Sequence, residues 1–177
     1  LGFGRGAVDF VSQYDIVLPS KLRTGNQSVY NHYPHPRADL DALIHIVSES
    51  HPSYIPTLDS FFSSDSMYAC LNFVMKRKLF EKLSTWIFSS LEKLELQTDW
   101  HSYTDYDSIR TPAYLAERFF NVWLNELLRN ETVKTVHRES YLLIQKMNYK
   151  NLLRRFFTKL MIWKGRIRVF GYEFTNE

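Results

Sequence analysis

The chain has 177 residues and a formal net charge of +3, and its 45% hydrophobic content provides one hydrophobic core and excludes an intrinsically disordered protein. No apolar run approaches the roughly 18 residues of a membrane-spanning helix, and the opening residues lack a starting Met and the apolar core of a signal peptide, so we expect a segment of a longer protein. The single cysteine, Cys70, excludes an internal disulfide and fits a reducing compartment, from which we expect a cytoplasmic location.

The first predicted element is a short buried strand over residues 14–18, which Pro19 ends. A polar loop over residues 24–28 follows it. Apolar residues at helical spacing then predict a helix over residues 39–50, and the His-Pro step behind that helix begins a second one over residues 54–62.

The second half of the chain alternates in the same way. Residues 67–75 are a strand candidate, and residues 76–94 have the apolar spacing of a long helix. A polar loop rich in Tyr and Asp precedes a helix over residues 113–128, and the alternation over residues 167–174 predicts a last strand. We therefore predict an α/β fold that is predominantly helical, with a few short strands.

The C-terminal part is basic, so we divide the chain into a domain over residues 1–130 and a basic segment over residues 131–177. Between residues 140 and 172 there are eight basic and no acidic residues, namely Lys146, Lys150, Arg154, Arg155, Lys159, Lys164, Arg166 and Arg168. Residues 150–163 form an amphipathic helical pattern that suits an anionic membrane surface. Packing on its own domain and nucleic-acid binding are the alternatives, although no nucleic-acid motif is present.

The most informative pair of residues is Glu117 and Arg118, inside the helix predicted over residues 113–128. Eleven of those sixteen residues are apolar, which is typical of a buried helix. Burying a carboxylate costs several kcal/mol unless the carboxylate is paired or neutralised. We therefore expect a partner, a raised pKa or a wet cavity at Glu117, and each of these is compatible with a catalytic carboxylate.

Several sequence motifs follow one another in a recognisable order: YDIVLPSK, SVYNHY with DLDAL, NFVMKRKLFEKLSTWIF and ERFFNVWL. This order resembles a bacterial family of capsule and O-antigen biosynthesis proteins that are regarded as galactofuranosyltransferases. The likeness covers roughly residues 14–124 and corresponds to the C-terminal, acceptor-side portion of the family's domain. It implies a GT-A-like fold, a UDP-sugar donor and a lipid-linked glycan acceptor at the cytoplasmic face of the inner membrane.

The resemblance implies galactofuranose transfer from UDP-galactofuranose with inversion, which requires a base for the acceptor hydroxyl. We assign that role to Glu117, with Arg118 and Asn121 as substrate contacts. An ion pair of Glu117 with Arg118 or Arg110 is the alternative, as is an ordinary core hydrogen bond for Asn121. A divalent cation, Mg or Mn, is left open, because the acidic pair in Asp105-Tyr-Asp107 also suits a solvated or capping loop.

Two further positions are candidate substrate contacts. His35 and Asp39 are predicted to contact sugar, although His32 and Asp41 beside them raise the alternatives of a metal site or of helix capping by Asp39. The spacing fits no zinc motif, so we assign no metal ligands.

Lys76 is predicted to face a phosphate or the acceptor carboxylate, with a lysine lying along the first turn of a helix as the alternative. Two other classes of function stay open for the chain as a whole: a basic helical module that binds nucleic acid or a protein without catalysis, and a catalytically silent fragment.

Overall fold

The computed structural model of the chain describes residue 10 and residues 12–33, 36–69, 71–138, 165–169 and 172–176. The chain divides into two units, Leu1–Ser140 and Tyr141–Glu177. In the second unit the structure describes an antiparallel hairpin of β6 (Gly165–Val169) and β7 (Tyr172–Asn176). The single strand predicted over residues 167–174 is therefore wrong, because two strands share that stretch. The predicted basic helix over residues 150–163 lies outside the described residues.

The first unit contains a small mixed sheet with the strand order β4-β1-β5. In it, β1 (Ile16–Pro19) pairs in parallel with β5 (Thr135–Arg138) and antiparallel with β4 (Val74–Met75). Ile16 and Leu18 are buried, as expected of the predicted strand. Since β5 belongs to this sheet, the first unit extends past the boundary that we placed after residue 130.

The single strand predicted over residues 67–75 is wrong. The structure has two short strands there, β3 (Ser66–Met67), which pairs with β2 (Leu22–Arg23), and β4, which belongs to the other sheet. The physical reason lies at Tyr68, whose backbone N–H and C=O both bond to the side chain of Asn121. These groups cannot continue a strand ladder, so the chain leaves one sheet before it enters the next.

The four helices predicted between residues 39 and 128 are confirmed to within a few residues at each end, and the structure adds short helical turns between them. The helical elements are α2 (Arg37–Ser50), η1 (Pro52–Tyr54), α3 (Ile55–Ser63), α4 (Arg77–Glu95), η2 (Trp100–Ser102), α5 (Tyr106–Ile109) and α6 (Thr111–Asn130). The described part of the first unit is thus mostly helical with a few short strands, as the sequence predicts. In that part no helix is both long and apolar enough to cross a membrane.

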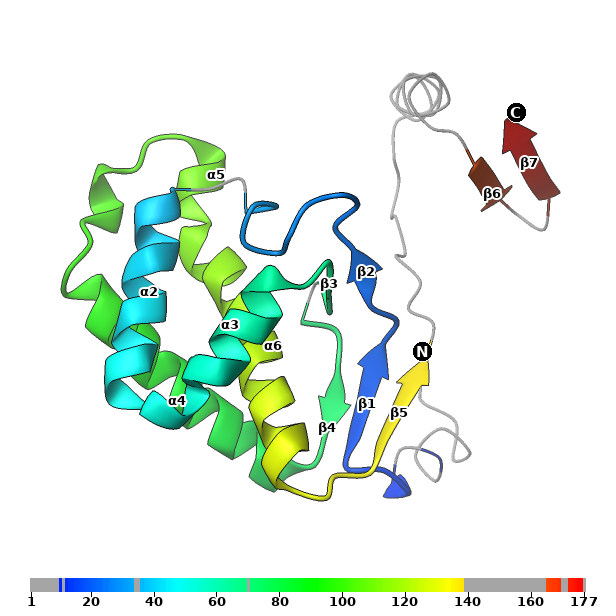
Figure 1. Ribbon diagram of the computed structural model, residues 1–177, viewed down its shortest axis with the longest axis horizontal. Coiled ribbons are helices and arrows are strands. Elements are labelled where there is room, and N and C mark those ends of the chain that lie inside the picture. The colour runs from blue at the N-terminus through cyan, green and yellow to red at the C-terminus, as the bar shows by residue number, and fades with distance from the viewer. Residues whose placement is uncertain are drawn as a thin grey trace. The chain divides into compact units, whose positions relative to one another are not determined.

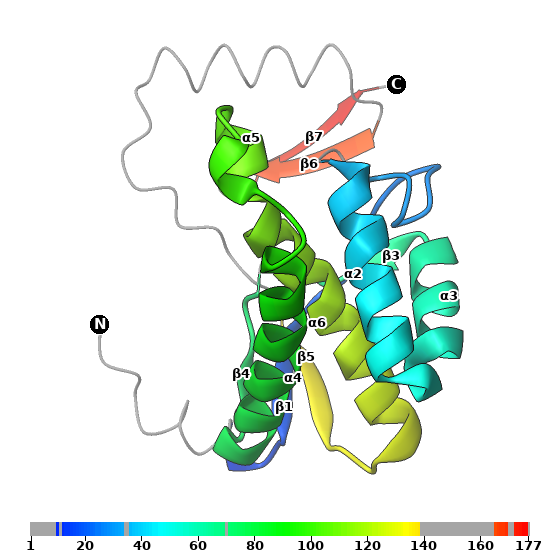
Figure 2. The same cartoon turned by 90° about the vertical axis from the view of Figure 1, so that its left-hand side faces the viewer.

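Helix α6 is the centre of the core. It packs against α3 and α4, and Figure 2 shows α2, α3 and α4 gathered around it. Phe119 and Phe120 are among its fully buried side chains, and each such burial stabilises the fold by about 2–3 kcal/mol. Phe62 and Trp86 pack on Phe119 from α3 and α4, so the two neighbouring helices are fixed against α6 through aromatic contacts.

Several elements share one direction in this unit. Figure 1 shows α6 running antiparallel to β5, and β1 and β5 pointing toward the end of the unit at which α2 begins beside α5. We call this end the strand-carboxyl end. In open α/β sheets ligands bind outside the carboxyl ends of parallel strands, and helix N-termini add a positive field. The strand-carboxyl end is therefore the place to look for a site.

Candidate functional site

Helix α6 carries the Glu117–Arg118 pair toward the strand-carboxyl end. Arg110 is the N-cap of this helix and Pro112 lies in its first turn, where a missing N–H is harmless. Residues 118–124 are all buried, which agrees with the predicted burial of the helix. Glu117, however, is partly exposed, and the enclosed charge is that of Arg118, which is 4% exposed. The expectation of an enclosed carboxylate is corrected, because the core surrounds the neighbouring guanidinium instead.

The guanidinium of Arg118 lies over the ring of Tyr33, with 4.6 Å from Cζ to the ring centroid. Its Nη1 donates a hydrogen bond to the carbonyl of Tyr114 at 3.2 Å. Within the described part of the chain its Nε has no hydrogen-bond partner. Burial lowers the pKa of Arg118, whereas Tyr33 and Glu117 act in the opposite direction, and a guanidinium stays charged under these conditions. A permanent positive charge therefore lies beside Glu117.

Asp39 reaches the same region from the first turn of α2. It is 4% exposed, and its Oδ2 accepts a hydrogen bond from the hydroxyl of Tyr103 at 2.8 Å. The N-cap of α2 is Pro36, and no side chain caps the helix, so the alternative of capping by Asp39 is not what the structure has. Burial and the bond to Asp39 raise the pKa of Tyr103 to about 12.

Tyr33 connects Asp39 with Arg118. Burial raises the pKa of Tyr33, the positive charge of Arg118 opposes that rise, and the negative charge of Asp39 adds to it. Tyr33 therefore feels both charges and keeps its proton at neutral pH. We call Tyr33, Asp39, Tyr103 and Arg118 the buried polar cluster, and it unites two of the substrate contacts that the sequence predicts.

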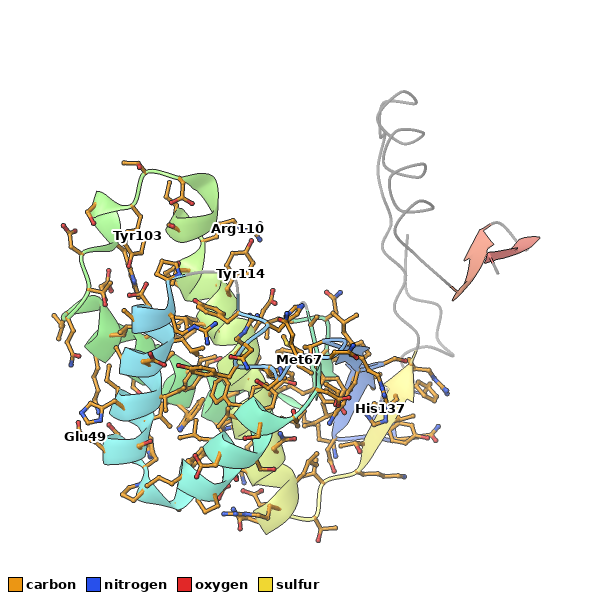
Figure 3. The ribbon with its side chains drawn as sticks, turned by 45° about the horizontal axis from the view of Figure 1, so that its top comes forward. Glu49, Met67, Tyr103, Arg110, Tyr114 and His137 are labelled. Carbon is orange, nitrogen blue, oxygen red and sulfur yellow. The ribbon has the colours of Figure 1, made fainter. Side chains whose placement is uncertain are left out.

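More cationic and aromatic side chains lie near this cluster at the start of α6. Figure 3 shows Tyr103, Arg110 and Tyr114 at one end of the unit. The guanidinium of Arg110 lies over the ring of Tyr114, with 5.0 Å from Cζ to the ring centroid. The strand-carboxyl end therefore presents aromatic surface together with positive charge, a combination that suits a sugar ring and an anionic group.

Asn121 has a different environment from its neighbours on α6. It is 2% exposed, its Oδ1 accepts from the N–H of Tyr68 at 2.7 Å, and its Nδ2 donates to the carbonyl of Tyr68 at 3.0 Å. Nδ2 also donates to the carbonyl of Glu117 at 2.8 Å. These bonds occupy the amide and favour the core hydrogen-bonding alternative. Asn121 is thus a positioning residue for Tyr68.

Lys76 lies at the opposite end of the sheet. Its Nζ is 2.6 Å from Oδ1 of Asp15, the residue that precedes β1, and the backbone N–H of Lys134 donates to Oδ2 of Asp15 at 2.7 Å. The bond from Lys76 and the bond from Lys134 hold the pKa of Asp15 below its usual range. This ion pair joins the start of α4 to β1 and β5. The structure does not bring Lys76 together with Glu117.

The His- and Asp-rich segment that leads into α2 is described only in part. His35 lies outside the described residues, and its predicted contact with sugar stays a prediction. Asp41 accepts a hydrogen bond from the hydroxyl of Tyr30 at 2.8 Å. Among the described residues no group of three or more His, Cys, Asp or Glu side chains is placed to hold a metal ion.

The Asp105-Tyr-Asp107 sequence forms the entry to α5. Oδ1 of Asp105 accepts a hydrogen bond from the backbone N–H of Ser108 at 2.9 Å, which is the bond of a helix cap. The side chain of Asp107 lies outside the described part. The geometry of Asp105 therefore favours the capping loop over the cation site.

Sequence reasoning missed Tyr33 and Tyr103 in the cluster, and it missed a buried carboxylate, Glu126. Glu126 is 5% exposed and accepts hydrogen bonds from Thr57, from Asn130 and from Arg129. The only signal in the sequence is the position of Glu126 on an apolar helix. Tyr33 and Tyr103 come together only through tertiary contacts, and no periodic sequence pattern predicts such contacts.

Comparison with known proteins gives the family of the chain. The model of a family described as a domain of unknown function, DUF4422, matches residues 5–130, and the chain belongs to that family. No curated protein matches the chain. Among solved structures, the chain is similar to WbbM, a bifunctional glycosyltransferase in its apo form, with 26% sequence identity and a TM-score of 0.67.

The likeness to WbbM covers 78% of this chain and 26% of the WbbM chain, so this polypeptide corresponds to about a quarter of that protein. The likeness includes both sequence and fold. The chain is therefore related to a glycosyltransferase, in agreement with the coarse part of the family resemblance.

Proposed function

We propose that this chain is the acceptor-side portion of a GT-A-like glycosyltransferase domain that builds bacterial capsule or O-antigen polysaccharide. The reaction is transfer of galactofuranose from UDP-galactofuranose to a lipid-linked glycan, with inversion. The observation that carries the proposal is the likeness to the WbbM glycosyltransferase over 78% of the chain. The sequence motifs point to the same family and to the same donor.

Glu117 is the proposed general base. Its carboxylate is partly exposed, so an acceptor hydroxyl can reach it, and the hydrogen bond of Arg118 runs to the carbonyl of Tyr114 rather than to Glu117. In the reaction the carboxylate takes the proton as the hydroxyl oxygen attacks the anomeric carbon. The buried Arg118 fixes a positive charge beside the proton acceptor throughout.

The substrate contacts that we propose are Asp39, His35 and Arg118. Asp39 and Arg118 support the proposal through the buried polar cluster, in which aromatic rings lie next to fixed charges. A sugar ring that reaches this cluster finds a carboxylate and a guanidinium for its hydroxyls and aromatic rings for its C–H faces. The proposed acceptor is lipid-linked, so we place the protein at the cytoplasmic face of the inner membrane through its basic segment.

The test uses the intact protein with UDP-galactofuranose and a lipid-linked glycan acceptor. We expect one hexose to be added to the acceptor, with the anomeric configuration inverted, as measured by mass spectrometry and by NMR of the product. UDP-galactopyranose serves as the control donor and should give little product. If UDP-galactopyranose is used at an equal rate, the assignment of a furanose donor is wrong. If the protein transfers sugar from none of the UDP-sugars, the proposal of a glycosyltransferase is wrong.

A further inference from the structure

Three side chains from separate segments meet at the strand-carboxyl end. The hydroxyl of Tyr68 lies 2.7 Å from Nε2 of His137, and the Nζ of Lys21 lies over the Tyr68 ring at 5.2 Å from its centroid. Lys21 follows β1, Tyr68 follows β3 and His137 lies in β5. Figure 3 shows His137 on the same side as Met67, the neighbour of Tyr68. We call these three residues the Tyr68 group.

The position of His137 in the sheet fixes which face the Tyr68 group occupies. His137 is the register partner of Leu18 in the parallel pair, and partners in adjacent strands point to the same face. Leu18 is 1% exposed and belongs to the hydrophobic core. The imidazole therefore lies on the core-facing side of the sheet, one residue from the end of β5, and His137 is exposed there.

The Tyr68 group presents positive charge and hydrogen-bond donors. Lys21 is exposed, and among the described residues no carboxylate pairs with its ammonium group, whereas the nearby Arg23 is 3.7 Å from Asp65. Burial raises the pKa of Tyr68, so its hydroxyl stays protonated and can donate to Nε2 of His137. In that tautomer the proton of the imidazole is on Nδ1, which becomes a second donor.

Tyr68 itself is rigidly held. It is 6% exposed, and Asn121 binds both its N–H and its carbonyl. The same amide of Asn121 donates to the carbonyl of Glu117 at 2.8 Å. The group is thus connected by hydrogen bonds to the turn of α6 that carries the proposed base. A rigid connection of this kind keeps two parts of one site in register.

We propose that Lys21 and His137, positioned by Tyr68, bind the diphosphate of the nucleotide sugar at the carboxyl ends of β1 and β5. The assignment rests on the proposed function and extends it to the leaving group. As the acceptor oxygen bonds to the anomeric carbon, the bond from that carbon to the phosphate oxygen breaks. The electron pair stays on the phosphate, while the hydroxyl proton goes to Glu117. The ammonium of Lys21 and the N–H of His137 stabilise the negative charge that the departing UDP gains.

The test is a calorimetric titration of the intact protein with UDP, with inorganic pyrophosphate and with uridine. Lys21→Met should weaken binding of UDP and pyrophosphate about tenfold or more, because a charge-assisted contact is lost. Tyr68→Phe, which removes only a hydroxyl, should weaken both ligands by a smaller factor. Binding of uridine should be unchanged in both variants.

Arg23→Met is the matched control. It removes the same charge two residues along the chain, from an exposed side chain that pairs with Asp65. We expect it to change UDP binding less than twofold. Equal binding of UDP by wild type and Lys21→Met would overturn the assignment, and so would an equal loss in Arg23→Met. Binding of neither UDP nor pyrophosphate by the wild-type protein would overturn it as well.

Sugar transfer by the same variants separates this assignment from the proposed function. If the wild type transfers sugar and Lys21→Met keeps its kcat/KM, the diphosphate site is wrong and the transferase stands. If UDP and pyrophosphate bind through Lys21 but no sugar is transferred, the anion site stands and the transferase is wrong. Loss of both nucleotide affinity and kcat/KM in Lys21→Met supports both.

Discussion

Asn121 holds Tyr68 by both of its backbone groups, accepting from its N–H at 2.7 Å and donating to its carbonyl at 3.0 Å. This pair of bonds joins α6 to the segment between β3 and β4. It also places Tyr68 beside His137 at the end of β5. One amide side chain therefore connects the helix of the proposed base with the strand ends where ligands bind in this class of sheet.

The first prediction concerns that connection. Asn121→Ala leaves the N–H and the carbonyl of Tyr68 without partners in a buried place, which costs about 2–4 kcal/mol of unfolding free energy. Urea unfolding of the variant and the wild type measures this loss. Asn125→Ala, on the same helix at a partly exposed position, should cost less than about 1 kcal/mol. An equal loss in the two variants would show that the Tyr68 bonds do not matter for stability.

The second prediction concerns the base. Glu117→Gln in the intact protein should lower kcat of sugar transfer by about 10²–10⁴-fold, because the amide keeps the shape of the carboxylate and cannot take a proton. The unfolding midpoint should stay near that of the wild type, since Glu117 is only partly buried. Glu92→Gln, at an exposed position of α4, is the control and should leave kcat unchanged. A wild-type rate in Glu117→Gln would reject Glu117 as the base.

The helices α2, α4 and α6 and the strand β1 could be predicted from the sequence because each has a periodic apolar pattern. The orientation of Glu117 and Arg118 could not. Neighbouring helical residues differ by about 100° around the axis, and α6 is apolar on most sides, so periodicity does not say which of the two charges faces the core. The answer depends on Tyr33, which lies in a distant loop and stacks on Arg118.

The remaining misses have the same origin. β3 and β4 are two residues long, and their separation depends on Asn121, more than fifty residues away. β5 is too short for its own pattern to be distinctive, and its pairing with β1 spans most of the first unit. The sequence motifs identify Asp39 as a candidate site residue, but they do not identify its hydrogen-bond partner Tyr103. Local patterns predict elements, whereas contacts between them decide the site.

The third prediction separates two roles of Lys76. As part of an ion pair whose lysine side chain is 58% exposed, Lys76 should contribute at most about 1 kcal/mol to stability. Because the pair lies at the amino end of β1, we expect Lys76→Met to leave KM for both substrates unchanged. Steady-state kinetics and urea unfolding of this variant measure the two quantities. A rise of tenfold or more in either KM, with stability unchanged, would restore the predicted contact with substrate.

The fourth prediction follows from the carboxylate of Glu126. Burial alone raises its pKa, but hydrogen bonds from Thr57, Asn130 and Arg129 outweigh burial, and the pKa in the folded protein lies below the ordinary value of 4.5. A carboxyl whose pKa is lower in the folded state adds stability above its unfolded pKa and loses that contribution as the pH falls through the folded value. The wild type should therefore exceed Glu126→Gln in unfolding free energy at pH 7, and this difference should shrink below about pH 4.5.

Urea unfolding of both proteins between about pH 3 and about pH 7, a range that spans the titration of this carboxyl, measures this difference. Asp15 also titrates with a lowered pKa, but it is present in both proteins and cancels in the comparison. Glu49→Gln, at an exposed position paired with His45, should show no such trend. A gap between wild type and Glu126→Gln that is constant over the whole range would contradict the lowered pKa.

The last prediction concerns residues 150–163 of the basic segment, which lie outside the described residues. Deleting residues 150–163 from the intact protein removes Lys150, Arg154, Arg155 and Lys159 together with the apolar residues between them. Each basic residue near an anionic membrane contributes about 1 kcal/mol to binding, so cosedimentation with vesicles that contain anionic lipid should fall by at least about tenfold. Zwitterionic vesicles are the control, and binding to them should be weak for both proteins. If the deletion variant binds anionic vesicles as strongly as the wild type, residues 150–163 do not supply the membrane contact. The segment would then be assigned to packing within the protein.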